Sequence, residues 1–437
     1  ITHSLAFFNL MKLHIKISTA VIAISYISVC SAAAGNDFPQ FILATALKSD
    51  EIIAAQKELA IKKEAINTVR SDYFPTLDAD ISGSWVRDDK KISGLVERTA
   101  DIINPHTFTL TVDQNVWNGG QTSISEDISI LDYRSQKLKL LDSIQQKILG
   151  LVKLNSEVFK LKKVLNLKEK NESVLNYHLK SSKIRFKMGE ISETDVFRSE
   201  ARLASIVSEK IKAEYDLQIA IQKYQAEYKT DIVENLIIKP LDVERLPIDQ
   251  IIENNYSLQS DRYTQKSLKL QYKLQKQNNL PSLDVTGTVA HSRQTINRDN
   301  DSTKLTAQLS LSMPLYDGGK NSSQVSTSLY RLKKFQNDYN VSVKDLNISY
   351  NSQFGQYQSL LQQIKALKIE INAAGKALEA TKKEVDVGTK AIVDLLDAEK
   401  ELLDAKLNLL NEEERLVIIT YEMKILAGLL VPAETIE

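Results

Sequence analysis

Hydrophobic and polar residues alternate in four short stretches of the chain. In residues 305–313 every odd-numbered position is apolar and every even-numbered position is polar, and a similar alternation runs through 77–85, 108–116 and 283–289. A period of two places the two sets of side chains on opposite faces of a β-strand. The pattern therefore predicts four strands, each with one apolar and one polar face. Such strands either cover the core of a soluble sheet or face lipid around a wet lumen, and alternation alone leaves both open.

Long helical stretches separate these strand pairs. They cover about 121–187 and 320–386, and each is followed, after a glycine, by a further helix of about 40 residues. At 1.5 Å per residue the long helices would reach roughly 100 Å. Shorter helical segments at 38–73 and about 247–279 precede the first strand of each pair. The last helix has apolar residues at every seventh position, which is typical of coiled-coil packing: Leu395, Leu402, Leu409, Leu416, Met423 and Leu430.

The chain contains the same pattern twice. The Gly-Gly pairs, the helix-breaking glycines and two aspartates recur 199 residues apart, and Pro75 recurs as Pro281 at an offset of 206. This spacing predicts a first structural repeat at 35–230, a linker at 231–250, a second repeat at 251–428 and a tail at 429–437. Its landmarks are the strand–helix joints and the helix breaks, namely Pro75, Gly119, Gly120, Pro281, Gly318, Gly319, Gly189 and Gly388.

Residues 1–34 are expected to be upstream residues and a secretory signal peptide. Met11 is followed by Lys12 and Lys16, an apolar run at 17–29 and small residues before Gly35. This order is typical of a segment cleaved on export, here after Ala34. A transmembrane anchor and a lipid attached to Cys30 are the alternatives. Because the rest of the chain has no apolar stretch of helix-spanning length, an exported protein would be soluble or enter a membrane as strands.

Composition narrows the class of protein further. Lys and Arg total 56, as do Asp and Glu, and this balance argues against a nucleic-acid binder. Only 14 glycines and 8 prolines occur in 437 residues, so turns are few and the elements are long. One cysteine excludes a disulfide scaffold and a cysteine-based zinc site. With neither a nucleophile-elbow motif nor paired histidines, we predict no enzymatic activity, no cofactor and no metal site.

The most specific segment is residues 387–398, Val-Gly-Thr-Lys-Ala-Ile-Val-Asp-Leu-Leu-Asp-Ala. It resembles the Val-Gly-Thr-Arg-Thr-Ile-Val-Asp-Val-Leu-Asp-Ala segment of the TolC-like outer-membrane efflux ducts. Residues 188–196 are similar to the corresponding segment in the family's first repeat. The resemblance implies a mixed α and β membrane protein, a homotrimer in which four strands per subunit make a 12-stranded β-barrel. A long antiparallel coiled-coil α-barrel continues it.

The same resemblance implies a function and a location. Ducts of this family sit in the cell outer membrane, surrounded by its lipid, and project into the periplasm. They serve as the exit duct for efflux or protein export. A periplasmic adaptor protein couples them to an inner-membrane transporter, and the duct is gated at its periplasmic tip. The alternative is a periplasmic coiled-coil scaffold or adaptor without a pore, although adaptors use a single hairpin and β-sandwich modules.

Candidate pore and gate residues lie near the two helix breaks. Asp394 and Asp397 lie on one helix face, and three copies would place six carboxylates around one axis, which favours cations in a pore. The resemblance assigns Lys390 and Thr194 to a contact between neighbouring tip helices. It also assigns Asp195 to a tie with a tyrosine. Val385 occupies the tyrosine's position, so that tie is expected to be missing.

Overall fold

The structure is a computed structural model that describes residues 40–91, 98–229, 237–294 and 301–432. The predicted signal peptide lies outside these residues, as do 231–236 of the predicted linker and 433–437 of the predicted tail. The bounds of the long helices coincide with those expected from the sequence. α4 spans Gln121–Lys187 and α8 spans Lys320–Asp386, each followed by a shorter helix, α5 (Glu193–Tyr228) and α9 (Ile392–Leu426).

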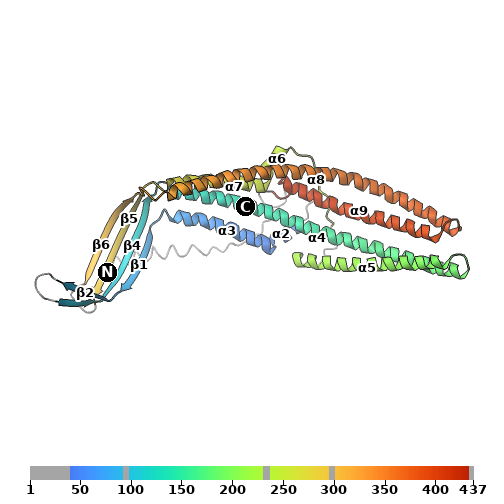
Figure 1. Ribbon diagram of the computed structural model, residues 1–437, viewed down its shortest axis with the longest axis horizontal. Helices are drawn as coiled ribbons and strands as arrows, with labels where there is room; N and C mark the ends of the chain where they lie inside the picture. Colours follow the sequence, from blue (N-terminus) through green and yellow to red (C-terminus); the bar gives the residue numbers. More distant parts are fainter. Residues whose placement is uncertain (1–39, 92–97, 230–236, 295–300, 433–437) are drawn as a thin grey trace. The chain divides into compact units, whose positions relative to one another are not determined.

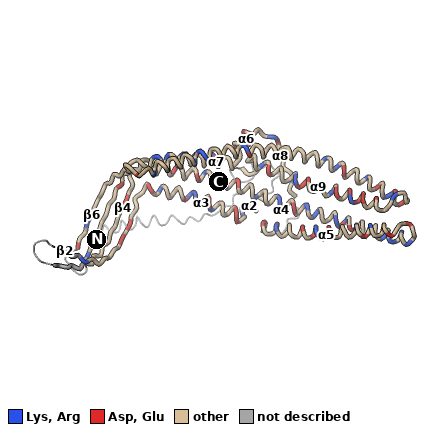
Figure 2. Tube along the Cα trace, in the orientation of Figure 1, with Lys and Arg blue, Asp and Glu red and all other residues tan. Residues whose placement is uncertain are grey.

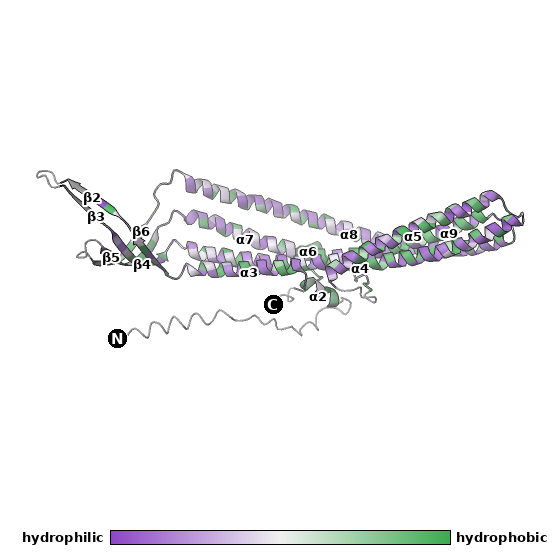
Figure 3. Cartoon of the chain, turned by 90° about the horizontal axis from the view of Figure 1, so that it is seen from below, coloured by the Kyte–Doolittle hydropathy of each residue, from purple (hydrophilic) through white to green (hydrophobic). Residues whose placement is uncertain are grey.

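Two helical hairpins dominate the helical part of the chain. α5 packs back along α4, and α9 packs back along α8 (Figure 1). α9 also contacts α4 and α5, so the two hairpins touch each other. Hydrophobic and hydrophilic residues are interspersed along these helices (Figure 3). Buried residues recur between exposed ones along each of them, so each helix buries one side and leaves another for solvent or a partner.

The strands form one four-stranded antiparallel sheet in the order β1-β4-β5-β6. β1 spans Thr76–Gly83, β4 Pro105–Trp117, β5 Ser282–Gln294 and β6 Ser302–Ser312. The central pair β4–β5 joins the two halves of the chain, with Leu110 opposite Val289. β1 and β6 are the edges of this sheet (Figure 1). All four predicted strands are present, although the first ends at Gly83 and leaves Trp85 outside it.

The segment between the first two predicted strands forms two further strands, which the alternation did not predict. Val86–Lys91 (β2) and Arg98–Ile103 (β3) form a separate antiparallel two-stranded sheet, so the described chain has six strands rather than four. These strands carry many charges and lack a period-two alternation, and the hydrophobic pattern therefore gave no strand signal there. The pairing of β1 with β4 brings the two ends of this segment together and favours hairpin formation.

Each of the two shorter helical segments is interrupted once. α2 (Gln40–Leu47) and α3 (Asp50–Ser71) meet at Ser49, whose hydroxyl accepts a hydrogen bond from the backbone N–H of Ile52. α6 (Ile248–Asn254) and α7 (Tyr256–Gln277) meet at Asn255, whose side-chain oxygen accepts from the N–H of Leu258 at 3.0 Å. Ser and Asn are preferred at such N-cap positions, so each residue starts a new helix.

The apolar heptad of α9 serves two interfaces. Leu395 packs with Val385 and Ile392, which closes the α8–α9 hairpin. Leu396 and Leu403, one position further on, pack instead with Leu175 of α4 and Ile206 of α5. α9 packs against helices on two sides, so it carries two adjacent rows of apolar residues. The packed seam predicted from the heptad is confirmed, and it continues to Met423 in a cluster with α6, α7 and α8.

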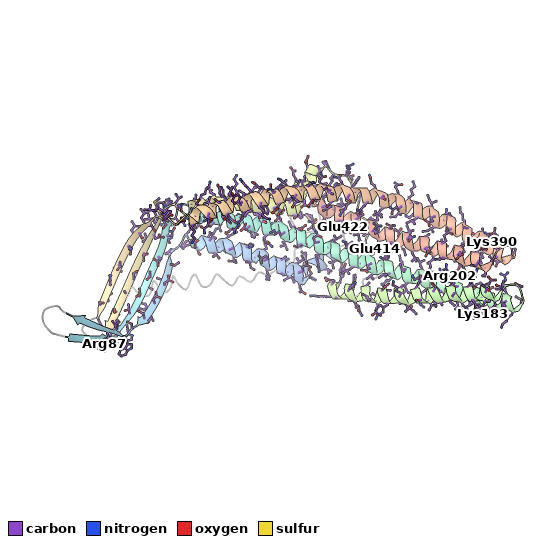
Figure 4. All side chains as sticks on the ribbon, in the orientation of Figure 1. Arg87, Lys183, Arg202, Lys390, Glu414 and Glu422 are labelled. Atoms are coloured by element: carbon purple, nitrogen blue, oxygen red, sulfur yellow. The ribbon has the colours of Figure 1, made fainter. Side chains whose placement is uncertain are left out.

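Charged residues of both signs are interspersed along the helices (Figure 2). Several form ion pairs that join separate helices, such as Lys160 with Glu414 at 2.7 Å and Lys153 with Glu422 at 2.8 Å. Figure 4 labels the two glutamates. Partly exposed pairs of this kind contribute little each, because water already solvates the separate charges. The apolar seams therefore supply most of the packing energy between the helices.

Asp142 of α4 provides a test of this helical packing. Burial raises the pKa of its carboxyl, and a hydrogen bond from Gln146 offsets only part of that rise. A raised folded-state pKa means that the ionised carboxylate opposes folding at neutral pH and stops doing so as pH falls through that value. Asp142→Asn should therefore raise the melting temperature by a few degrees at about pH 7, with no gain at about pH 4. Asp127→Asn, an exposed change on the same helix, is the control.

Candidate pore and gate

Both helix–helix turns use the same backbone design. Gly189 has φ +77° and Gly388 has φ +79°, a left-handed conformation that favours glycine. The next residue in each turn donates its N–H back to the long helix, from Glu190 to the Arg185 carbonyl at 2.9 Å and from Thr389 to the Glu384 carbonyl at 2.9 Å. Such bonds satisfy carbonyls at a helix C-terminus. The predicted helix breaks thus lie in the two turns.

Each turn also carries an ion pair, and the two pairs have opposite polarity. In the α4–α5 turn Arg185 on the helix binds Glu190 at 3.0 Å. In the α8–α9 turn Glu384 on the helix binds Lys390 at 2.8 Å. Figure 4 labels Lys390. The hydrogen bond from Lys390 to Glu384 and the charge of that glutamate raise the pKa of the lysine. Position 185 corresponds to 384 at the 199-residue offset, so the two turns are matched in backbone and reversed in charge.

Asp195 and Asp394 begin the returning helices. A carboxylate oxygen of Asp195 accepts hydrogen bonds from the backbone N–H and the hydroxyl of Ser192, at 3.2 and 2.7 Å. A carboxylate oxygen of Asp394 accepts one from the backbone N–H of Ala391 at 3.1 Å. Acceptors at this position satisfy N–H groups that a helix start leaves unpaired. Both aspartates therefore have a structural role, whatever else they do.

The remaining candidate gate residues lie in the same two turns without forming the expected tie in one copy. Thr194 is exposed at the start of α5, and the ion-pair partner of Lys390 is Glu384 of its own hairpin. Asp397 is exposed on α9, three residues after Asp394. Val385 is only 2% exposed and belongs to the hairpin core, so an apolar contact replaces the family's tyrosine there. The Lys390–Thr194 contact remains a prediction.

The predicted strand–helix joints are backbone features. Gly119, Gly120, Gly318 and Gly319 have φ between +68° and +87°, and they connect β4 to α4 and β6 to α8. At Gly119 an added Cβ would also press against the side chain of Leu280. The carboxylate of Asp317 accepts a hydrogen bond from the backbone N–H of Asn321 at 2.7 Å and so caps α8. Pro75 and Pro281 stand just before β1 and β5.

The sheet exposes both of its faces in a single copy. Leu77, Ile81, Leu305 and Leu309, all on the apolar face, are 65%, 84%, 79% and 68% exposed. On the opposite face, polar side chains link neighbouring strands, with Thr286 donating to Asp113 and Asn115 to Asp284, both at 2.6 Å. A soluble sheet would bury its apolar face against a core. This one leaves it open, which marks that face for contact with lipid or another molecule.

Two further observations limit the chemistry of the site. Within the described residues, no helix is both long and apolar enough to cross a membrane. The same residues contain no group of three His, Cys, Asp or Glu side chains placed to hold a metal ion.

Comparison with known proteins decides the family. The model of the outer membrane efflux protein family matches residues 44–224 and residues 248–428, which is most of the chain. The chain belongs to the outer membrane efflux protein family. The predicted resemblance is therefore confirmed, and membership places this protein in the outer membrane.

Solved structures share the fold of this family member. CusC superposes with a TM-score of 0.80 at 13% identity, over 92% of this chain and 95% of CusC. The CmeC outer membrane channel of Campylobacter jejuni gives 0.79 at 12%, covering 93% and 92%. VceC, an outer membrane protein of Vibrio cholerae, gives 0.76 at 14%, covering 89% and 96%. No curated protein sequence matches the chain.

Sequence reasoning missed the partners that hold the turns. Arg185, Glu190 and Glu384 were not among the candidate residues, although all three lie within six positions of a predicted helix break. A charged residue on the last turn of each long helix, followed by an opposite charge after the glycine, was the available signal. Because the chain reverses direction at each glycine, the two opposite charges could have been expected to lie side by side.

Proposed function

We propose that three copies of this chain form an efflux duct across the outer membrane. The open sheet carries this proposal. Its two edge strands, β1 and β6, each have a partner on one side only within the described sheet. Unpaired edges invite pairing with another chain, and spanning barrels need at least about eight strands. Three copies would supply twelve strands, pair every edge and leave a central opening.

The two faces of the sheet suit such a barrel. The exposed leucines and isoleucine would face lipid, and the polar face would line the lumen. That polar face carries Asp78, Asp80, Asp113 and Asp284 against one cation, Lys304, in the described strands. The lumen would therefore attract cations and carry water. The helical hairpins would continue the duct as an antiparallel α-barrel in the periplasm. The glycine pairs Gly119–Gly120 and Gly318–Gly319 would connect the strands of the β-barrel to these helices.

The turns would form the periplasmic mouth of the duct. A periplasmic adaptor bound there would couple the duct to an inner-membrane transporter, which supplies the energy and selects the substrate. The duct itself performs no chemical step and conducts passively, for small molecules or exported proteins. We propose Asp394, Asp397, Lys390, Thr194 and Asp195 as the residues that line or close this mouth, with Gly189 and Gly388 shaping it.

Membrane fractionation and planar-bilayer recording test the proposal together. The mature protein should stay with the outer membrane after salt and alkaline washes, and the purified trimer should give discrete conductance steps. A periplasmic scaffold would wash off and give no steps. Release by alkali together with a silent bilayer would overturn the duct.

Charge at the mouth should set ion selectivity. Asp394→Asn combined with Asp397→Asn should shift the reversal potential in a salt gradient towards zero, because three copies lose six carboxylates. Asparagine keeps an acceptor for the Ala391 N–H, so the start of α9 is preserved. Asp195→Asn is the matched control, since Arg198 replaces the second aspartate in the first repeat. Asp195→Asn should shift the reversal potential less than the double variant does. Equal shifts would mean that Asp394 and Asp397 do not line the lumen.

Lys390 should help to keep the mouth closed. Lys390→Ala removes the ion pair with Glu384 and any contact with a neighbouring tip helix. We expect resting conductance to rise several-fold in planar bilayers. Lys390→Arg keeps the charge and adds a planar fork of donors, so it should leave conductance unchanged or lower it. A normal resting conductance in Lys390→Ala would mean that helix packing alone closes the duct.

A further inference from the structure

A small polar cavity lies where the two helical hairpins meet. Its volume is about 40 Å³, and its walls come from α4, α5 and α9. Four apolar residues form the surrounding contact, namely Leu175, Ile206, Leu396 and Leu403. Polar side chains reach into this apolar seam, which is unusual for a helix–helix interface. The cavity belongs neither to the sheet nor to the turns described above.

Three buried polar atoms of the cavity walls lack a hydrogen-bond partner among the described residues. They are Oδ1 of Asn171 on α4, Nη2 of Arg202 on α5 and Oε2 of Glu399 on α9. Figure 4 labels Arg202. The other carboxylate oxygen of Glu399 lies 2.8 Å from Nε2 of His178, with the two side chains 12% and 7% exposed. Buried polar groups in folded proteins almost always have a partner, so three such atoms around one cavity point to a bound molecule.

The chemistry of these atoms suits a water molecule. Arg202 offers a donor with positive charge, whereas Asn171 and Glu399 offer acceptors. A water molecule accepts from the guanidinium and donates to both oxygens, giving the three hydrogen bonds typical of a buried water. A metal ion would meet the guanidinium, and an anion would meet the carboxylate. A volume of about 40 Å³ is enough for a water molecule.

We propose that this cavity binds a water molecule which, with Asn171, His178, Arg202 and Glu399, forms a polar node joining the two hairpins. The node connects α4 and α5 of one hairpin to α9 of the other through Glu399. Any movement that separates the hairpins breaks the contact between His178 and Glu399 and widens the cavity, which is partly open to solvent. The node therefore favours the packed arrangement of the hairpins. Its effect on the mouth of the duct rests on the function proposed above.

The internal repeat supplies a matched control for this node. Glu200 holds the position of Glu399 in the first half of the chain, 199 residues earlier. Its carboxylate binds Lys183 on the neighbouring α4 at 2.7 Å, with both side chains about half exposed. The partner of Glu399, His178, corresponds to Ala377 in the second half. Of the two equivalent glutamates, only Glu399 thus belongs to the buried node. A change at Glu200 therefore measures what an exposed ion pair at the same position contributes to stability.

The first test is a crystal or cryo-electron-microscopy map of the wild-type protein that resolves bound water. We expect a peak in the cavity within hydrogen-bonding distance, about 2.7–3.2 Å, of Asn171 Oδ1, Arg202 Nη2 and Glu399 Oε2. A direct bond between Arg202 and Glu399 with no peak would overturn the water site. This measurement does not depend on conduction, so it stands even if the protein forms no duct.

The second test compares Glu399→Gln with Glu200→Gln in the full chain. Glu399→Gln should lower the melting temperature by several degrees and raise resting conductance several-fold, whereas Glu200→Gln should change neither. Equal melting temperatures in the two variants would overturn the node, and a lowered melting temperature with unchanged conductance would overturn its effect on the mouth. If Glu399→Gln does not fold, Arg202→Gln should show the same pattern to a smaller degree. A wild-type protein that never conducts would contradict the duct rather than the node.

Discussion

Leu305→Arg should prevent the protein from assembling in the outer membrane. Leu305 is 79% exposed in a single copy and lies in the central row of the sheet, opposite Val289. If this face contacts lipid, an arginine there costs about 2–4 kcal/mol per copy. A trimer carries that penalty three times. We expect the variant to be lost from the outer-membrane fraction and to form less of the proposed trimer, measured by crosslinking in cells.

Thr306→Arg is the matched control for this prediction. Thr306 is the next residue of β6, lies on the polar face and is opposite Thr288. In the proposed barrel its side chain points into a wet lumen that also carries Asp78 and Asp80, so an arginine there is solvated and attracted. Thr306→Arg should assemble normally and reduce cation conductance. Normal assembly of Leu305→Arg, or equal loss of both variants, would mean that the apolar face does not contact lipid.

The long helices could be predicted from sequence because their signals are local. Each begins after a Gly-Gly pair and ends before a single glycine, and glycine at these places is required by left-handed backbone at Gly120 and Gly189. Between the glycines few residues break a helix, so the bounds of α4 and α8 follow from the sequence alone. The four strands of the sheet were equally accessible, since period two is visible in a few residues.

The features that escaped prediction depend on contacts between distant residues. His178 and Glu399 are 221 positions apart. Each follows a buried leucine by three positions, which places it on a packed helix face but does not reveal its partner. Arg202 looks like any other charge on a solvated helix. Only the packing of α9 against the first hairpin brings these side chains together. Likewise β2 and β3 pair because β1 and β4 hold their ends, although their own sequences do not alternate.

The two halves of the chain share backbone geometry but differ in charge. The turns have the same glycine conformations and the same back-bonding, yet Arg185 is replaced by Glu384 and Arg198 by Asp397. Glycine is needed for the left-handed backbone, and an aspartate caps the returning helix in both turns. The charges on the exposed surface are under no such requirement and differ between the two halves. In a trimer, three turns of one polarity would alternate with three of the other. Such alternation would let neighbouring turns attract one another, which fits a mouth that closes without partners.

Gly428→Ala should destabilise the protein more than the same change at either turn glycine, Gly189 or Gly388. Gly428 follows α9 with φ +66°, and its N–H bonds the carbonyl of Ile425 at 2.9 Å. A Cβ at this position would overlap the backbone carbonyl of Asn254, where α6 meets α7. A main-chain carbonyl held between two helices cannot rotate away as a side chain does. The left-handed backbone and this overlap together should cost about 3 kcal/mol or more.

Gly388→Ala separates the two contributions to that loss. Gly388 has a similar φ of +79°, but an added Cβ would meet no described atom within 4 Å. Only the cost of placing alanine in left-handed backbone remains, and this lowers the stability of the protein by about 1–2 kcal/mol. Thermal unfolding of both variants should therefore show a clearly larger loss of stability at Gly428, together with a lower yield of folded protein. Equal losses would mean that the α6–α7 joint moves freely, and that the end of α9 does not fix the position of the second repeat's first helices.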